Sequence, residues 1–229
     1  MKLHLTRTAA AAALVLCSLG AHASVVATNT DYTKFSTVLT ATKPLSVTAH
    51  GTIRDVDLTI DFAKCDDPGT NASGQCAGIG KPFNNEIVFR LQGPNGQSVS
   101  LVERNTYTST TPGPGLGRIQ VTFDDEAAAQ VGGVLAPGSF RPLQPLSVFD
   151  GMDMSGTWNL FVQDTGAGDP LEFFGATLDV DFDRRQVPEP ATAAIIGLGL
   201  AGMAALRRRR RTFARQPSGA ANSGAGAAL

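Results

Sequence analysis

Acidic side chains are concentrated in three short segments, at points where alternation of apolar residues stops. The segments are 124–126, 150–153 and 164–169. Calcium prefers several oxygen ligands, which loops can bring together at the ends of strands. The candidate calcium ligands are therefore Asp124, Asp125, Asp164 and Asp169. The alternative is that these aspartates occupy turns, where their side chains bond to the backbone without a metal.

Cys65 and Cys76 form a second candidate pair. They bracket the segment CDDPGTNASGQC, whose small and turn-forming residues indicate a loop. Two cysteines this close favour a disulfide in an exported protein. A metal site would need further Cys or His residues nearby, and the segment has none.

Catalytic patterns are scarce in the sequence. Outside the first 23 residues the only histidine is His50, so a Ser-His-Asp triad would have to be built on it. No Gly-x-Ser-x-Gly elbow is present. The glycine-rich segment 113–117 lacks the lysine and helix of a phosphate-binding loop. We therefore expect that the protein is not an enzyme.

Charge separates the middle of the chain from its ends. The whole chain has a formal net charge of −1, but residues 24–186 hold 11 Lys and Arg against 19 Asp and Glu. An acidic body repels phosphate backbones, which argues against nucleic acid as a partner.

Strands are predicted from alternation with a period of two. In the segment 54–62, RDVDLTIDF, Val56, Leu58 and Ile60 point to one side and the aspartates to the other. The same alternation occurs at 87–92, 98–102, 119–123, 158–163 and 178–182. Residues 93–96, GPNG, predict a hairpin turn between the second and third of these strands. Trp158 shares its strand face with Leu160 and Val162, which favours a core position over a sugar-stacking one.

These patterns predict an all-β protein, an antiparallel jelly-roll-like β-sandwich, because long helical periodicity is absent between the two ends. An N-terminal arm at 24–43 should precede a sandwich at 44–183. A linker at 184–190 then leads to a single membrane-spanning helix at 191–206 and an Arg-rich cytoplasmic end with a disordered tail at 207–229.

The N-terminus has the three parts of a secretory signal peptide, residues 1–23. Lys2 and Arg7 precede an apolar run from Thr8 to Leu19. Ala21 and Ala23 then form the A-x-A cleavage site, so the mature protein should start at Ser24.

The C-terminal segment predicts insertion into a membrane. Residues 191–206 are uncharged, and as a helix they would reach about 24 Å, slightly under the thickness of the hydrocarbon core. The block of Arg207, Arg208, Arg209, Arg210 and Arg211 should stay cytoplasmic as a stop.

The order of these features resembles the PEP-CTERM sorting signal of Gram-negative bacteria. The matching residues are Val187, Pro188, Glu189 and Pro190, then the apolar helix, then the arginine block. The resemblance implies an exosortase as partner, removal of the helix, and delivery from the periplasmic side of the inner membrane to the cell surface or an exopolysaccharide matrix. The tail after Arg211 is longer than such signals usually have.

The body resembles the P domain, or Homo B domain, of kexin- and furin-like proteases. The resemblance rests on an ordered set of motifs, among them GPNG at 93–96, GTWNL at 156–160 and VQD followed by GD at 162–169. Two departures stand out, because Lys64 replaces a family histidine and Glu86 a family aspartate. Some modules of this kind bind calcium, which is the one cofactor that the resemblance implies.

Three classes of function follow from these observations. We expect an exported, non-catalytic surface or matrix protein whose sandwich has a structural or binding role, with exopolysaccharide as a candidate partner. The first alternative is an accessory module that acts with a separately encoded subtilisin-like protease. The second is an enzyme of unrecognised type, which the missing catalytic motifs disfavour.

Overall fold

A computed structural model describes residues 22–109, 113–183 and 199 of the chain. The chain divides into two units, Met1–Arg185 and Gln186–Leu229. The predicted signal peptide up to residue 21 lies outside the described residues, as does the predicted membrane helix apart from Gly199. Among the residues that the structure describes, no helix is long and apolar enough to cross a membrane.

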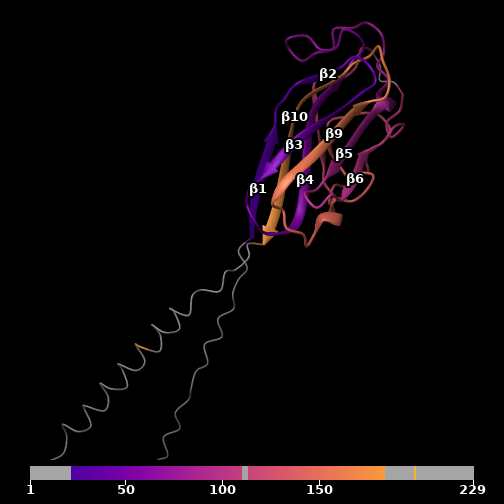
Figure 1. Cartoon of the computed structure of the whole chain (residues 1–229). Helices are drawn as coiled ribbons and strands as arrows, with labels where there is room; N and C mark the ends of the chain where they lie inside the picture. The colour runs from indigo at the N-terminus through magenta and orange to yellow at the C-terminus, as the bar shows by residue number, and fades with distance from the viewer. Residues whose placement is uncertain (1–21, 110–112, 184–198, 200–229) are drawn as a thin grey trace, which may run out of the picture. The chain divides into compact units, whose positions relative to one another are not determined.

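Two β-sheets make up the first unit (Figure 1). The larger sheet contains β1 (His22–Asn29), β2 (Thr33–Phe35), β4 (Thr52–Lys64), β7 (Ile119–Phe123), β8 (Gly138–Phe140) and β10 (Leu171–Asp183). Its strand order is β1-β10-β4-β7-β8, and the short β2 also pairs with β10. We call it the six-stranded sheet.

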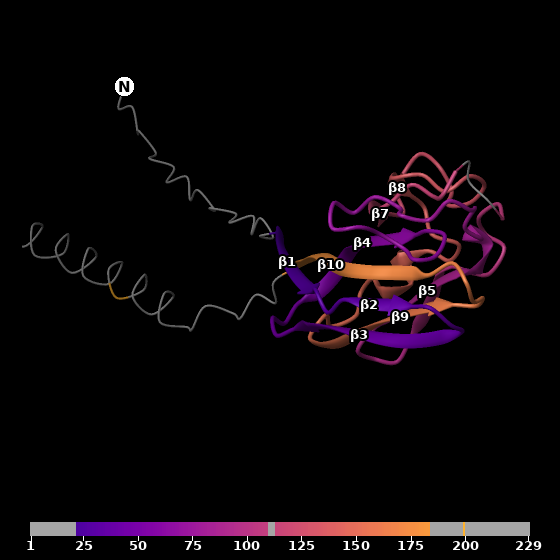
Figure 2. The ribbon, with the colours of Figure 1, turned by 90° about the horizontal axis from the view of Figure 1, so that it is seen from above.

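The second sheet has the order β3-β9-β5-β6. Its strands are β3 (Leu39–Val47), β5 (Ile87–Gln92), β6 (Ser98–Val102) and β9 (Gly156–Asp164). Figure 2 shows the two layers, with β4, β7 and β10 in one and β3, β5 and β9 in the other. Two short 3-10 helices, η1 (Asn84–Glu86) and η2 (Leu146–Phe149), lie in the connections.

The predicted all-β sandwich is therefore confirmed. Every strand pair in the two sheets is antiparallel except β7–β8, which is parallel, so the expectation of a purely antiparallel sandwich needs this one correction. Strand β8 is only three residues long and follows a loop from β7 that is long enough to reverse the chain direction.

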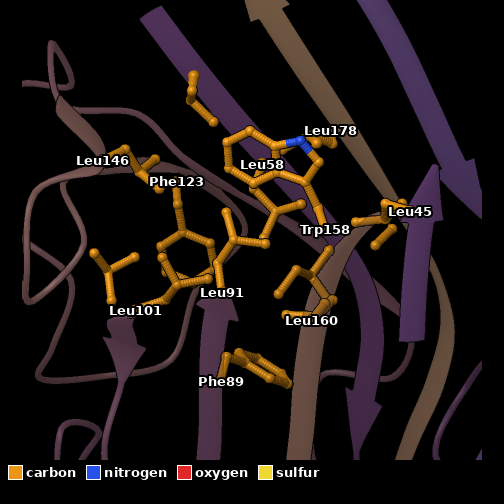
Figure 3. Close-up of a cluster of buried hydrophobic side chains, with 14 of the residues drawn as sticks. Leu45, Leu58, Phe89, Leu91, Leu101, Phe123, Leu146, Trp158, Leu160 and Leu178 are labelled. Atoms are coloured by element: carbon orange, nitrogen blue, oxygen red, sulfur yellow. The ribbon is translucent and has the colours of Figure 1, made fainter. Parts of the chain in front are cut away.

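The core lies between the sheets, where alternate side chains of facing strands interdigitate (Figure 3). Leu58 from the six-stranded sheet and Leu91, Trp158 and Leu160 from the four-stranded sheet have no solvent exposure. The Trp158 ring packs edge-on against Phe149, and its Nε1 donates to the Met154 carbonyl at 3.1 Å. Trp158 is thus a core residue, as its strand face predicted.

The predicted strands and hairpin are confirmed: β5, β6 and β7 have the predicted bounds, and β4, β9 and β10 are longer than predicted. Strand β4 extends the alternating segment 54–62 by two residues at each end. Gly93 N–H donates to the Gln97 carbonyl at 2.8 Å and closes the turn between β5 and β6. Gly96 has φ +87°, a conformation that glycine adopts without steric cost.

The N-terminal arm predicted at 24–43 is part of the sandwich. Strands β1 and β2 pair with β10, and β3 pairs with β9 across the predicted boundary at residue 44. The segment is Thr-rich, and Ala27 and Phe35 are its only buried apolar residues among those described, so its apolar alternation is too weak to predict strands. His22 is the register partner of Asp183, so the two ends of the sandwich lie side by side.

Candidate functional site

The four candidate calcium ligands separate into two places. Asp124 and Asp125 follow β7, whereas Asp164 ends β9 and Asp169 lies in the loop before β10. Asp125 accepts from the backbone N–H groups of Leu146 at 3.0 Å and Ser147 at 2.8 Å, and so caps η2. Asp124 accepts from the Glu126 N–H at 2.6 Å in a tight turn.

Asp164 and Asp169 surround the ammonium group of Lys64. Lys64 Nζ lies 2.8 Å from Asp164 Oδ2 and 3.1 Å from Asp169 Oδ2, and Glu86 Oε2 is 3.3 Å away. The Lys64 side chain has no solvent exposure. The position between these carboxylates, where a calcium ion would have to bind, is filled by a lysine nitrogen.

The predicted ligand set therefore does not come together at one site. Asp124 follows Phe123, which pairs with Leu58, and Leu58 lies six residues before Lys64 on β4. At about 3.3 Å per strand residue the two aspartate pairs are on the order of 20 Å apart. No group of three or more His, Cys, Asp or Glu among residues 22–109 and 113–183 is arranged to hold a metal. Calcium binding remains a prediction, without this shared site.

Lys64 and Glu86 are also two of the departures from the P-domain pattern, and the structure places them in contact. Burial raises the pKa of Asp164 and of Glu86, and the nearby Lys64 ammonium offsets part of that rise. The backbone N–H of Leu171 also donates to Asp164 Oδ2 at 3.0 Å. We call Lys64, Glu86, Asp164 and Asp169 the Lys64 cluster. Its charged groups bond to one another and to backbone N–H groups of Phe83 and Leu171, which indicates a structural role.

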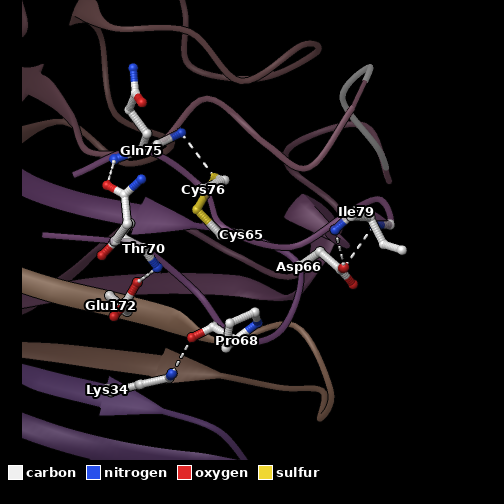
Figure 4. The surroundings of a disulfide bond; sticks show 12 residues. Lys34, Cys65, Asp66, Pro68, Thr70, Gln75, Cys76, Ile79 and Glu172 are labelled. Atoms are coloured by element: carbon white, nitrogen blue, oxygen red, sulfur yellow. Dashed lines mark hydrogen bonds between the residues drawn. A yellow bond between two sulfur atoms is a disulfide. The ribbon is translucent and has the colours of Figure 1, made fainter. Parts of the chain in front are cut away.

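Cys65 and Cys76 form the predicted disulfide, with a Cα–Cα distance of 5.4 Å (Figure 4). Closing a loop of this length stabilises the fold by about 2–3 kcal/mol. The loop has further anchors: Glu172 accepts from the Thr70 N–H at 2.6 Å, and Asp66 accepts from the Ile79 N–H at 3.1 Å. The bond fixes a loop that borders the outer face of the six-stranded sheet.

That outer face carries rows of polar side chains across neighbouring strands. One row is made of threonines, because Thr28 pairs with Thr177, Thr177 with Thr59, and Thr59 with Thr122. We call these four residues the threonine row. The hydroxyls of Thr59 and Thr122 are hydrogen-bonded at 2.9 Å.

The next row towards the chain ends is acidic. Asp57 is the register partner of Asp179, and each has a buried Oδ1 without a hydrogen-bond partner among the described residues. Burial, followed by repulsion from Asp55 and Asp124, raises the pKa of Asp57 to about 7. The charge of this row therefore depends on pH near neutrality, because Asp57 takes up a proton as the pH falls through about 7.

On the other side of the threonine row lies an ion pair. Arg118 donates to Asp61 through two bonds of 2.8 and 2.7 Å, and Gln120 Nε2 lies 3.4 Å from the same carboxylate. Two hollows flank Arg118, one of about 200 Å³ and one of about 490 Å³, and both are lined by Asp61, Arg118 and Gln120. We call these two hollows together the Arg118 groove.

One aromatic ring, that of Phe174, lines the smaller hollow, and a second, that of Tyr32, packs beside Phe174 next to the groove. The guanidinium of Arg118 lies 4.5 Å from the centre of the Phe174 ring, and the centres of the Tyr32 and Phe174 rings are 5.4 Å apart, with their planes inclined at 45°. Tyr32 is 53% exposed, while its hydroxyl donates to the buried Glu172 at 2.6 Å. Burial of that hydroxyl and its bond to Glu172 raise the pKa of Tyr32 to about 12, so the hydroxyl stays protonated and the ring is held in place.

Sequence reasoning missed both the groove and the Lys64 cluster. A signal for the cluster was present: Lys64 continues the inward series of Phe62, and Asp164 continues the inward series of Val162. Two opposite charges at inward positions predict a buried ion pair. The contact of Tyr32 with Phe174 had no such signal, because Tyr32 directly precedes β2, and β2 pairs with β10 over a long sequence separation.

His50, the histidine on which a catalytic triad would have to be built, is at the surface. His50 has a side chain 71% exposed, and its Nδ1 lies 3.5 Å from Asp153. Tyr107, in contrast, is almost completely buried in the core.

Comparisons with known proteins identify the C-terminus. Residues 186–210 match the PEP-CTERM protein-sorting motif, which confirms the predicted resemblance of this segment to such a sorting signal. No curated protein matches the sequence of the chain. These C-terminal residues lie outside those that the structure describes.

Solved structures with a similar arrangement share little sequence with the chain. The serine protease of Aeromonas sobria in complex with its chaperone ORF2 has 10% identity and a TM-score of 0.37 over 72% of this chain and 28% of that one. The same protease alone has 12% identity and a TM-score of 0.35 over 72% of this chain and 28% of that one. Dimeric latent PorU of Porphyromonas gingivalis has 11% identity and a TM-score of 0.33 over 74% of this chain and 14% of that one.

The chain thus spans less than a third of each of these proteins, and TM-scores this low carry no argument about function. The two-sheet body agrees with the fold that the P-domain resemblance implied. What the motif match establishes is that this chain is a protein with a PEP-CTERM sorting signal behind a β-sandwich body.

Proposed function

We propose that the chain is an exported, non-catalytic surface or extracellular-matrix protein that an exosortase sorts through its C-terminal signal. The observation that carries the proposal is the match of residues 186–210 to the PEP-CTERM motif. The protein would first be held in the inner membrane with its body on the periplasmic side. It would then be released to the cell surface or the matrix.

Features of the body support a location outside the cytoplasm. The Cys65–Cys76 disulfide suits an oxidising compartment. The polar groups most strongly engaged with one another are those of the Lys64 cluster, which is buried and therefore inaccessible to a substrate. His50 is exposed and paired with Asp153, an arrangement that an ordinary surface ion pair explains. These observations favour a structural or binding role for the sandwich.

Mass spectrometry of the exported protein tests the proposal. We expect the surface form to lack Arg207–Arg211, because a sorting enzyme would cleave near Pro188–Pro190 and leave the helix behind. A variant with alanine at Pro188, Glu189 and Pro190 should keep the whole C-terminus and stay in the membrane fraction. As the matched control, deletion of residues 212–229 should leave processing unchanged. An intact C-terminus in all of the exported wild-type protein would show instead a permanent anchor.

A further inference from the structure

We propose that the Arg118 groove binds a polysaccharide chain without net charge. The inference rests on the proposed function only in that the protein must reach the cell surface to meet such a chain. The evidence for binding comes from the residues of the groove. The groove lies on the outer face of the six-stranded sheet, between the threonine row and the disulfide-bonded loop, and Ser73 and Gln75 of that loop line its larger hollow.

Flat surfaces are the first requirement for binding a sugar ring, because its C–H face packs on aromatic rings. Tyr32 offers an exposed ring whose hydroxyl is fixed by Glu172, so little side-chain freedom is lost on binding. The Arg118 guanidinium on Phe174 offers a second flat group beside the smaller hollow. Both surfaces are held in place by the protein before a ligand arrives.

Hydroxyl and amide groups supply the second requirement. Thr28, Thr59 and Thr177 line the smaller hollow together with Gln120. A threonine hydroxyl both donates and accepts, as a sugar hydroxyl does. Neighbouring strands are about 4.8 Å apart, so the threonine row repeats the same group at a regular step across four strands. A regular row favours a polymer with repeating hydroxyls over a single small molecule.

Charge decides which class of polysaccharide fits. Arg118 and Asp61 neutralise each other inside the groove. Above about pH 7, Asp57, only two residues from Thr59 on β4, and its partner Asp179 place negative charge along the border. An anionic polymer would be repelled there and would find no unpaired cation among the residues that line the two hollows. An uncharged chain avoids this cost.

Native gel electrophoresis in gels that contain a polysaccharide tests the proposal on the full-length protein in detergent. The probes are dextran, galactomannan and laminarin, which are uncharged, and alginate, which is anionic. We expect at least one uncharged polysaccharide to slow the protein and alginate to leave it unaffected. If none of the three slows it, or if alginate slows it most, the proposal is wrong.

Variants locate the site. Tyr32→Ala removes the exposed ring and should weaken retention by about tenfold or more, as loss of an anchoring aromatic does at binding surfaces. Tyr32→Phe keeps the ring and should retain most of the binding. The matched control is Phe161→Ala, because Phe161 lines a hollow on the outer face of the other sheet. Binding that is lost in Phe161→Ala and kept in Tyr32→Ala would overturn the assignment.

Failure of this proposal is distinguishable from failure of the proposed function. Tyr32→Ala should be exported and processed at its C-terminus as the wild type is, because Tyr32 is far in sequence from residues 186–210. Loss of binding with normal processing supports a separate site in the body. Normal processing of a wild-type protein that binds none of the probes would refute the groove alone.

Discussion

Lys64 supplies the positive charge that balances the buried carboxylates of the sandwich. Its ammonium compensates carboxylates from three different segments: Glu86 before β5, Asp164 at the end of β9 and Asp169 before β10. Because these segments belong to both sheets, the cluster links the two layers at the end of the sandwich remote from His22 and Asp183. A buried charge without its partner is far more costly than the pair.

We predict that Lys64→Met lowers the free energy of unfolding by about 3–5 kcal/mol, because Asp164 and Asp169 would remain buried without a cation. The matched control is Arg90→Met, which breaks the exposed Arg90–Glu103 pair and should cost about 1 kcal/mol or less. Denaturant titration of both variants measures the difference. Similar losses in the two would show that the cluster is no more important than a surface ion pair. Should Lys64→Met fail to fold, Asp169→Asn gives a milder test in the same direction.

At the scale of strands, register explains how the acidic row arises. Alternation in 54–62 predicted that Asp55, Asp57 and Asp61 face away from the core, and β4 confirms it. The sequence of 178–182 alternates in the same way, but nothing in it shows that Asp179 lies opposite Asp57. Facing carboxylates on adjacent strands repel each other, and the repulsion is present only while both are ionised.

The pH dependence of stability follows from the raised pKa of Asp57, which is about 7. Its pKa in the unfolded chain is about 4, so the folded state binds the proton more tightly between these values. The free energy of unfolding should therefore increase as the pH falls from 8 towards 5. The contribution that Asp57 protonation makes to it should be lost as the pH rises through about 7. Asp57→Asn should raise the melting temperature at pH 8 and flatten this dependence.

Thermal melts at several pH values check this prediction. Asp67→Asn is the control, because Asp67 is exposed in the disulfide-bonded loop and should leave the profile unchanged. A melting temperature at pH 8 that Asp57→Asn leaves at or below the wild-type value would contradict the expected repulsion.

For the whole molecule, the sequence was sufficient to predict the strands in which one face is buried and the other is solvated. Val56 to Phe62 and Trp158 to Val162 have that pattern, and both strands and the sandwich follow from it. The sequence was insufficient to predict contacts between residues that are far apart along the chain. Lys64 meets Asp164 across 100 residues, and Tyr32 meets Glu172 across 140. Local periodicity cannot show such pairings, because it reports only which face of a strand is apolar.

The topology also connects folding with export. Strand β1 begins at His22, so the predicted cleavage site after Ala23 lies inside the strand. Its partner β10 is the last strand of the body, and Ala23 pairs with Phe182. Strand β1 therefore cannot pair until the whole body has crossed the membrane. Signal peptidase, which needs an accessible extended segment, would have to act before that pairing or wait for β1 to open.

We predict that signal peptidase cleaves the unfolded or nascent chain and that the folded precursor resists it. Purified precursor, once folded in detergent, should be cleaved at least about tenfold more slowly than the same chain unfolded in mild denaturant that the peptidase tolerates, because opening an edge strand costs free energy. Gly175→Pro disrupts β10 beside the Asn29 end of β1 and should speed cleavage of the folded precursor. Gly96→Ala, in the distant β5–β6 turn, serves as the control for general destabilisation. Equal cleavage rates for folded and unfolded wild-type precursor would mean that β1 is not held by β10 at residues 22–24, and that the sandwich proper starts beyond the cleavage site.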